Sequence, residues 1–482
     1  MHAQIIWAGG NAGHLNDFNT KQNWSPQTQF DSTTSATLAQ FSGTAASLLP
    51  NITVATSVLG LQFNSGATAY TLSATSSSLS VFGSGIVNNS ASTQTISAPL
   101  ILGTAAAFTT GSTGALSISG TVSNGGFALT LNGSGTGASG ISGVISGAGA
   151  LTKSGTGTWT LSGANTYTGA TTISQGTIAV GVNAPSGSSG ALGNASSTIT
   201  LNDGSTGSNN TALTINATGV TIGRTVTVAN SGSGTVTLGG DSTLTSGTAS
   251  FTGNVTLNKS ASLQAGGSSV VTFGTGAIGG SGGVTKIGTG TVTLASANTF
   301  SGATTVSAGT LKTTAANALA STASVTVSTG GILELGTSNT VKDTAGVTLS
   351  GGTILRDAGV SETFGNLNLT TASTINFGTG AIGTLTFGTY TPTSLLTVSN
   401  FAQGDVLKFS SDLTSSINNG SLFSFSSAFT SSWNSGTSTF TITSVPEPSA
   451  IFAGVLMLGV LAWPHRRRVR ALYRTMRGTV AS

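Results

Sequence analysis

The sequence predicts an all-β protein that folds as a right-handed parallel β-helix, a solenoid in which each coil stacks its strands on the coil before it. Three observations support this prediction. Apolar residues alternate with threonine, serine or asparagine in short runs, glycine-rich clusters separate these runs, and one segment occurs twice in the chain. Alternation with a period of two is typical of half-buried strands, and a fixed internal repeat is typical of solenoids.

The alternating runs define the expected strands along the body of the chain. They include Leu116/Ile118, Phe127/Leu129/Leu131, Val236/Leu238, Val255/Leu257, Val292/Leu294, Val325/Val327, Leu367/Leu369 and Ile375/Phe377. Clusters such as 124–126, 154–157 and 328–331 separate the runs, and their glycines accept the positive φ values of tight turns. We therefore expect short strands, each ending in a bend, with roughly 20 to 25 residues per coil.

The composition favours a packed core over a disordered chain. Of 482 residues, 37% are hydrophobic and 5% are charged, whereas disordered segments combine low hydrophobicity with high net charge. The 70 glycines have no Gly-X-Y period, which excludes collagen. A disordered stalk glycosylated on serine and threonine remains an alternative. The chain has no cysteine, so disulfides and thiolate metal sites are excluded.

The clearest internal signal is the duplicated segment. Residues 151–178 are echoed at 284–311, with Lys153 matching Lys286 and Asn165 matching Asn298. The shared pattern is aliphatic-x-Lys-x-Gly-x-Gly, then Ala-Asn-x-aromatic-x-Gly, then Gly-x-aliphatic. Residues 150–180 and 283–313 thereby resemble the autotransporter-associated β-strand repeat, a β-helical building block. The resemblance implies a passenger-like rod at the cell surface, although no set of membrane-barrel segments follows it.

The chain divides into four parts that differ in composition and sequence pattern. We expect an N-terminal cap at 1–40, a β-helix at 41–390, a C-terminal cap and linker at 391–444, and a sorting segment at 445–482. Trp7, Phe18 and Trp24 depart from the monotonous body and suit a cap that covers the first open coil. A carbohydrate-contacting aromatic pair is the alternative for these residues.

The C-terminal segment combines three features in order. The motif Val445-Pro446-Glu447-Pro448, within 445–449, precedes a short apolar transmembrane segment at 450–464 and an arginine-rich tail at 465–482. Prolines keep the motif extended and accessible to proteases. Arg466, Arg467 and Arg468 are expected to stay on the cytoplasmic side of the membrane.

This arrangement resembles the PEP-CTERM sorting signal. The resemblance implies membrane insertion followed by cleavage near Pro446-Glu447-Pro448 by an exosortase-type membrane protease. The extension to Ser482 departs from the usual pattern, and a Pro-Glu-Pro sequence before a buried core helix is the alternative. Such proteins carry an N-terminal secretion signal, which residues 1–7 do not resemble, so we expect the reading frame to begin upstream.

Charge and catalytic side chains argue against several function classes. Residues 1–445 contain nine Lys/Arg and ten Asp/Glu, so the body is nearly neutral and we expect no nucleic-acid partner. The three histidines, His2, His14 and His465, are too scattered for a triad or a metal cluster. We expect no enzyme activity, no obligatory metal and no cofactor.

One enzymatic alternative remains open. A secreted β-helix enzyme acting on polysaccharides would need two carboxylates in one groove. The candidates weighed for such a pair are Asp203, Asp241, Glu334, Asp343, Asp357 and Glu362. Their spacing shows no motif, and isolated acids in a solenoid are usually turn residues. The leading prediction is an exported structural or adhesive surface protein, with exopolysaccharide or other surface proteins as its partners.

Overall fold

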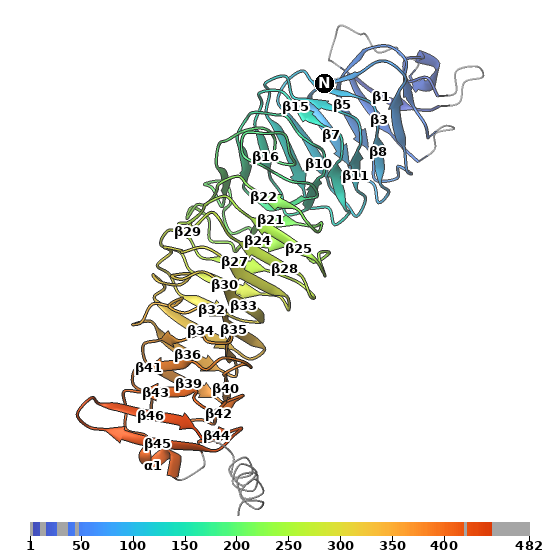
Figure 1. Cartoon of the computed structure of the whole chain (residues 1–482). Coiled ribbons are helices and arrows are strands. Elements are labelled where there is room, and N and C mark those ends of the chain that lie inside the picture. The colour runs from blue at the N-terminus through green and yellow to red at the C-terminus, as the bar shows by residue number, and fades with distance from the viewer. Residues whose placement is uncertain (1–2, 10–15, 27–36, 44–47, 419–421, 446–482) are drawn as a thin grey trace, which may run out of the picture.

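The computed structural model describes residues 3–9, 16–26, 37–43, 48–418 and 422–445. In these residues the chain forms an elongated parallel β-solenoid of about 17 turns with almost no helix (Figure 1). The predicted all-β solenoid is thereby confirmed. At about 4.8 Å per coil, the stack measures roughly 80 Å along its axis. The helical elements of the described residues are a 3-10 turn at Lys21–Asn23 and α1 at Thr414–Asn418.

The strands form four hydrogen-bonded sheets that run along the rod. The largest has 16 strands. Its members are β1 (Ala3–Trp7), β2 (Trp24–Ser25), β3 (Thr37–Phe41), β5 (Thr56–Phe63), β7 (Leu79–Asn88), β9 (Leu100–Leu102), β10 (Ala106–Thr110), β12 (Val122–Ser123), β13 (Leu129–Gly133), β15 (Ile145–Ser146), β16 (Leu151–Lys153), β18 (Thr171–Ile173), β20 (Ile199–Leu201), β23 (Val226–Val228), β26 (Val255–Leu257) and β29 (Ile278–Gly279).

A second sheet has 15 strands and covers another side of the rod. Its members are β4 (Asn51–Ile52), β6 (Thr71–Ala74), β8 (Gln94–Ile96), β11 (Leu116–Ile118), β14 (Ser139–Ile141), β17 (Thr158–Leu161), β19 (Gly176–Val180), β21 (Thr211–Ile215), β24 (Val236–Gly240), β27 (Ala261–Gln264), β30 (Val284–Ile287), β32 (Thr304–Val306), β34 (Ser324–Ser328), β36 (Gly346–Ser350) and β39 (Leu367–Thr371).

Two smaller sheets complete the solenoid. The 10-stranded sheet contains β22 (Thr221–Ile222), β25 (Thr248–Phe251), β28 (Val270–Phe273), β31 (Thr291–Leu294), β33 (Gly309–Thr313), β35 (Gly331–Leu335), β37 (Thr353–Arg356), β40 (Ser373–Asn376), β42 (Leu396–Ser399) and β44 (Phe423–Phe425). The 5-stranded sheet contains β38 (Glu362–Thr363), β41 (Thr384–Phe387), β43 (Val406–Phe409), β45 (Phe429–Asn434) and β46 (Thr439–Ser444).

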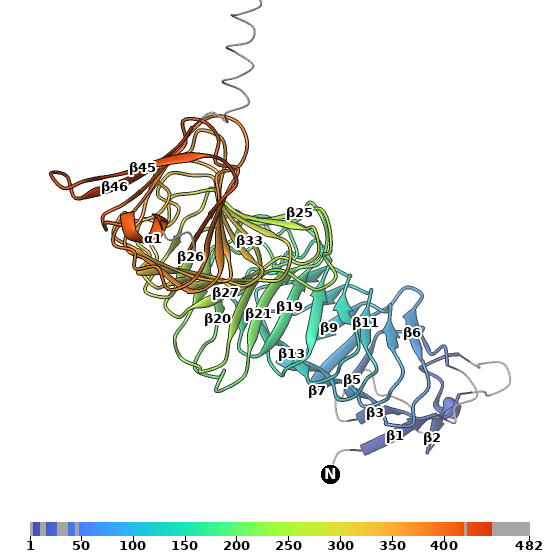
Figure 2. The same ribbon diagram turned by 90° about the horizontal axis from the view of Figure 1, so that it is seen from below.

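Each coil in the middle of the rod contributes one strand to each of three sheets. β23, β24 and β25 belong to the 16-, 15- and 10-stranded sheets, and β26 then pairs with β23 in the next coil. Further along, β36, β37 and β38 belong to the 15-, 10- and 5-stranded sheets. The largest sheet ends at β29. In the later coils, the third side of the solenoid is formed by the 5-stranded sheet. Figure 2 shows the same stack from below, with the first and last strands at opposite ends.

The core consists of like residues stacked from coil to coil. In β34, Val325 and Val327 are buried, whereas the serine and threonine residues between and beside them are half-buried. Val347 and Leu349 of β36 lie beside these two valines in the next coil. Period-two alternation thus directs every second side chain inward. Because the strands pair in parallel register, inward-facing residues lie beside inward-facing residues in the next coil.

Antiparallel strands occur near both ends of this otherwise parallel fold. β1 pairs antiparallel with β2 and parallel with β3, and β46 pairs antiparallel with β43 and β45. Trp7 and Trp24 are buried, with ring centroids 5.1 Å apart. The indole of Trp24 donates a hydrogen bond of 2.8 Å to the Phe18 carbonyl. These aromatic side chains are therefore core, and the alternative of a sugar-contacting surface pair is wrong.

No helix among the described residues is long and apolar enough to span a membrane. The expected transmembrane segment 450–464 lies outside the described residues, as do Pro446, Glu447, Pro448 and the arginines 466–468. Val445 directly follows β46, and its amide donates a hydrogen bond of 3.0 Å to the Ala428 carbonyl.

Candidate functional site

The duplicated segment forms the same four strands in both copies. The first copy supplies β16, β17, β18 and β19, and the second supplies β30, β31, β32 and β33. Leu151 and Val284 begin the first strand of each copy, and both are buried. The repeat recognised in the sequence is therefore also a repeat of structure.

A buried lysine holds the same corner in each copy. Lys153 donates hydrogen bonds to the carbonyls of Ser154, Gly155 and Gln175 at 2.9, 2.6 and 3.2 Å. Lys286 makes three matching bonds at 2.9, 2.7 and 3.1 Å. Burial lowers the pKa of Lys153 to about 7 and that of Lys286 to about 8. Both amines are committed to backbone carbonyls, which is a structural use.

The glycine that follows each lysine allows the corner to form. Gly155 has φ of 70° and Gly288 has φ of 76°, values that strain any residue with a Cβ atom. The turn brings two carbonyl oxygens toward each ammonium group. The Lys-x-Gly spacing of the repeat thus specifies both the turn and the lysine amine that donates hydrogen bonds to the carbonyls of that turn.

A buried asparagine links three successive coils in each copy. Asn165 accepts a hydrogen bond of 2.7 Å from the Ile145 amide in the preceding coil and donates one of 2.7 Å to the Ala191 carbonyl in the next. Asn298 makes the matching bonds to the Ile278 amide and the Ala318 carbonyl, at 2.8 and 2.9 Å. These side chains replace ladder hydrogen bonds where the chain is irregular.

Two of the weighed carboxylates lie around one lysine. Lys312 makes ion pairs with Glu334 and with Asp357, the latter at 2.9 Å, across neighbouring coils. Solvent reaches this group, since the side chains of all three residues are partly exposed. Because this cation binds both acids, the group has the composition of a surface ion-pair ladder rather than of a free acid and base.

The other weighed acids mostly accept hydrogen bonds from nearby turns. Asp241 accepts from the amides of Thr243 and Leu244, and Asp203 accepts from the hydroxyl of Ser174. Glu362 is buried and accepts from the amide and hydroxyl of Thr340, and burial raises its pKa. Asp343 and its neighbour Lys342 are exposed.

Metal-binding side chains do not converge in the described part of the chain. Within those ranges, no group of three or more His, Cys, Asp or Glu side chains lies where it could hold a metal ion. His2, His14 and His465 all fall outside the described residues. The absence of a metal, cofactor or enzymatic activity remains a prediction.

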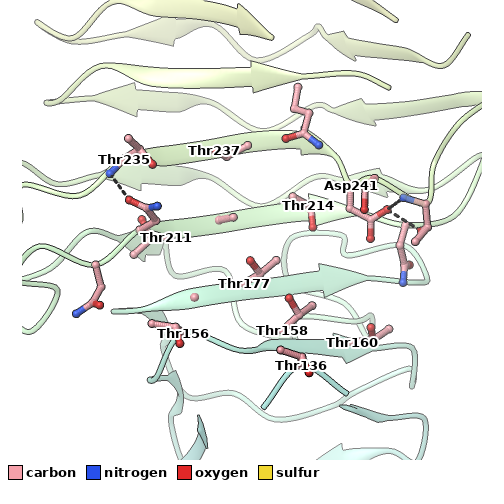
Figure 3. A pocket seen from close by; sticks show the side chains of 18 of the residues that line it. Thr136, Thr156, Thr158, Thr160, Thr177, Thr211, Thr214, Thr235, Thr237 and Asp241 are labelled. Carbon is pink, nitrogen blue, oxygen red and sulfur yellow. Dashed lines mark hydrogen bonds between the residues drawn. The ribbon is translucent and has the colours of Figure 1, made fainter. Parts of the chain in front are cut away.

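A groove that the sequence did not indicate lies on the outer side of the 15-stranded sheet. It has a volume of about 770 Å³ and crosses β17, β19, β21 and β24 beside the first repeat copy (Figure 3). The described residues that line it are threonine, serine, asparagine, glutamine, glycine and alanine, together with Asp241. The lining therefore combines hydroxyl and carboxamide groups with threonine methyl groups and alanines, and among the described residues it carries a single formal charge.

Unusually long coils produce this groove. Thr172, Thr200, Thr227 and Thr256 pair in turn across successive coils, at separations of 28, 27 and 29 residues. In the first repeat copy, Thr152 pairs with Thr172 only 20 residues later. In the second and third of these coils, the additional residues form loops around 203–210 and 241–247 that border the hollow. The uneven spacing of these paired threonines along the chain was the one available sequence signal for the groove.

Comparison with known families identifies the repeat. Residues 151–180 and 284–312 match the passenger-associated-transport-repeat, an autotransporter-associated repeat. Neither the curated proteins nor the solved structures yielded a match to the chain. The two matched ranges coincide with the copies predicted at 150–180 and 283–313. Two autotransporter-associated repeats on a β-solenoid fit a surface or secreted passenger-like protein.

Proposed function

We propose that this chain is an exported, non-enzymatic protein of the cell surface or extracellular matrix, with a structural or adhesive role. The observation that carries the proposal is the pair of matched repeats folded identically within one continuous rod. A rod of stacked coils presents long faces and keeps its ends far apart, which suits display outside a cell.

The use of buried polar groups supports a structural role. Each of the four repeat side chains bonds to the backbone of a neighbouring coil. They are Lys153, Lys286, Asn165 and Asn298. These are the most distinctive side chains of the repeat, and each stabilises a corner or a junction. The nearly neutral body offers no electrostatic attraction for nucleic acid.

We further propose that the C-terminal segment sorts the protein to the inner membrane and is then removed. The apolar segment 450–464 would insert, with Arg466, Arg467 and Arg468 held in the cytoplasm. An exosortase-type membrane protease would cut near Pro446-Glu447-Pro448 and release the rod toward the surface. The support for this step is the order of motif, apolar segment and arginine cluster in the sequence.

Mass spectrometry of the protein expressed from its native locus tests this proposal. We expect the mature C-terminus to lie between Val445 and Pro448, with the arginine tail missing from both membrane and medium fractions. A Glu447→Ala variant should keep the tail, whereas a Pro392→Ala control in the body should be processed normally. A wild-type chain that still ends at Ser482 in the membrane would refute the sorting step.

A further inference from the structure

The floor of the groove is a row of small outward-facing residues in register. Thr158 pairs with Thr177, Thr177 with Ala212, and Ala212 with Thr237 across four successive coils. Gln264 of the next coil lines the same groove. Four intervals of about 4.8 Å give a floor of about 19 Å along the rod. This is an extended, open-ended shape that suits a segment of a linear chain.

The walls are polar loops whose geometry is fixed by hydrogen bonds. On one side, the Asn210 carboxamide oxygen accepts a bond of 2.9 Å from the Thr235 amide. On the other, the Asp241 carboxylate accepts bonds of 2.7 and 2.6 Å from the amide and hydroxyl of Thr243 (Figure 3). Because these loops are held in place, the groove is largely formed before any ligand binds.

The lining chemistry discriminates among classes of ligand. The described residues around the groove include no lysine, arginine or aromatic residue, and Asp241 gives it one negative charge. Threonine methyl groups and alanines supply the apolar part of the lining, but an anionic polymer would find no cation to neutralise it. Hydroxyl and carboxamide groups are instead complementary to a ligand that carries many neutral hydroxyl groups.

One hydroxyl group beneath the groove lacks a partner in the described structure. Thr214 is 3% exposed, and its Oγ1 atom has no hydrogen-bond partner there. Thr214 belongs to β21 at the centre of the groove and lies on the same face of that strand as Ala212. A buried hydroxyl without a partner is unfavourable, so a hydroxyl-bearing ligand would have a group to satisfy at this position.

We propose that this groove binds a neutral oligosaccharide segment lying along the rod axis. The threonine and asparagine groups would hydrogen-bond to the sugar hydroxyls, and Asp241 would accept from one of them. This inference deepens the proposed surface function by giving the rod a glycan-binding site. It rests on that proposed function in one respect, which is that the rod lies outside the cell.

Isothermal titration calorimetry of the purified 482-residue chain tests the site. The probes are cellohexaose, maltohexaose, xylohexaose and mannohexaose, with hexagalacturonate as the anionic comparison. We expect at least one neutral hexasaccharide to bind saturably at one site, and hexagalacturonate not to bind. In a Thr237→Trp variant, the indole fills the floor of the groove and should weaken that binding at least tenfold.

Thr227→Trp is the matched control. Thr227 and Thr237 are both half-buried, outward-facing centres of Val-Thr-aliphatic triplets in the same coil, but Thr227 lies on the 16-stranded sheet. This control should bind like the wild type, and circular dichroism should show that both variants fold.

Three results would overturn the inference: no neutral hexasaccharide binds, Thr237→Trp binds as well as Thr227→Trp, or hexagalacturonate alone binds. Because the titration uses purified protein, none of these results depends on where the C-terminal segment is cut.

Discussion

The two repeat copies have the same fold but occupy different sides of the solenoid. In the first copy, β16 and β18 belong to the 16-stranded sheet, and β17 and β19 to the 15-stranded sheet. In the second, β30 and β32 belong to the 15-stranded sheet, and β31 and β33 to the 10-stranded sheet. The second copy is thus displaced by one side around the rod axis. The repeat therefore specifies a corner with its flanking strands, and does not specify a particular side.

The copies also differ in how they satisfy one interior position. In the first, the Tyr167 hydroxyl lies 2.9 Å from Thr171 Oγ1, to which buried Arg224 also donates at 3.2 Å. In the second, phenylalanine replaces the tyrosine, and Thr304 Oγ1 instead lies 2.9 Å from Thr322 Oγ1. An aromatic ring is needed here in both copies, whereas the polar partner of the threonine is supplied by whichever coil follows.

The largest expected effect tests what the copies share. Lys153→Met and Lys286→Met should each lower the free energy of unfolding by about 3 kcal/mol, because each leaves three carbonyls without their donor. Urea unfolding followed by circular dichroism measures this effect. Lys342→Met, at an exposed lysine, is the control and should change little. Unequal losses in the two copies would show that the corner depends on the side it occupies.

The pH dependence of stability should follow from the same two lysines. Burial lowers their pKa to about 7 and about 8, from 10.5, so above these values the unfolded chain binds more protons than the folded one. Stability should therefore rise with pH between about 8 and 10. Below pH 7 this contribution should be flat.

Urea titrations at several pH values, repeated with the Lys153→Met/Lys286→Met double variant, isolate this contribution. The variant should lose the slope. An identical profile in both proteins would mean that the three carbonyl oxygens keep each amine protonated in the folded state.

The smallest expected effect sharpens the difference between the copies. Tyr167→Phe converts the first copy to the aromatic residue of the second and should cost about 1 kcal/mol, because it removes one buried hydrogen bond. In a Thr171→Val background the same change should cost almost nothing, which a double-mutant cycle measures. If Tyr167→Phe costs the same in both backgrounds, the hydroxyl of Tyr167 stabilises the fold through a contact other than the one with Thr171.

The sequence allowed the fold to be predicted well because its signals are local and repeated. Alternation identified strands such as Val325/Val327, and the duplicated segment located both copies. The number of residues per coil was less well predicted. Coils of 27 to 29 residues between Thr172 and Thr256 exceed the expected range, because loop insertions leave the pairing of strands unchanged.

Contacts between distant residues escaped prediction. Arg356 and Asp405 form a buried ion pair, and the same carboxylate accepts bonds from the amides of Gly383 and Ala402. The guanidinium also lies 5.0 Å from the centre of the Phe377 ring. Nothing near either residue in the sequence signals its partner 49 positions away. The groove also escaped prediction, because its lining comes from several coils and the uneven spacing of the paired threonines does not by itself show where the additional residues lie.

The register of the coils has a consequence for how such a protein changes in length. Thr285 pairs with Thr305, 20 residues later, so both residues occupy the same place in consecutive coils. Excision of the segment between them would join two backbone positions that already point in the same direction, and would shorten the rod by one rise of about 4.8 Å. Duplication would lengthen it by the same step. The length of such a rod therefore changes in discrete steps of one coil, while the remaining coils keep their backbone register.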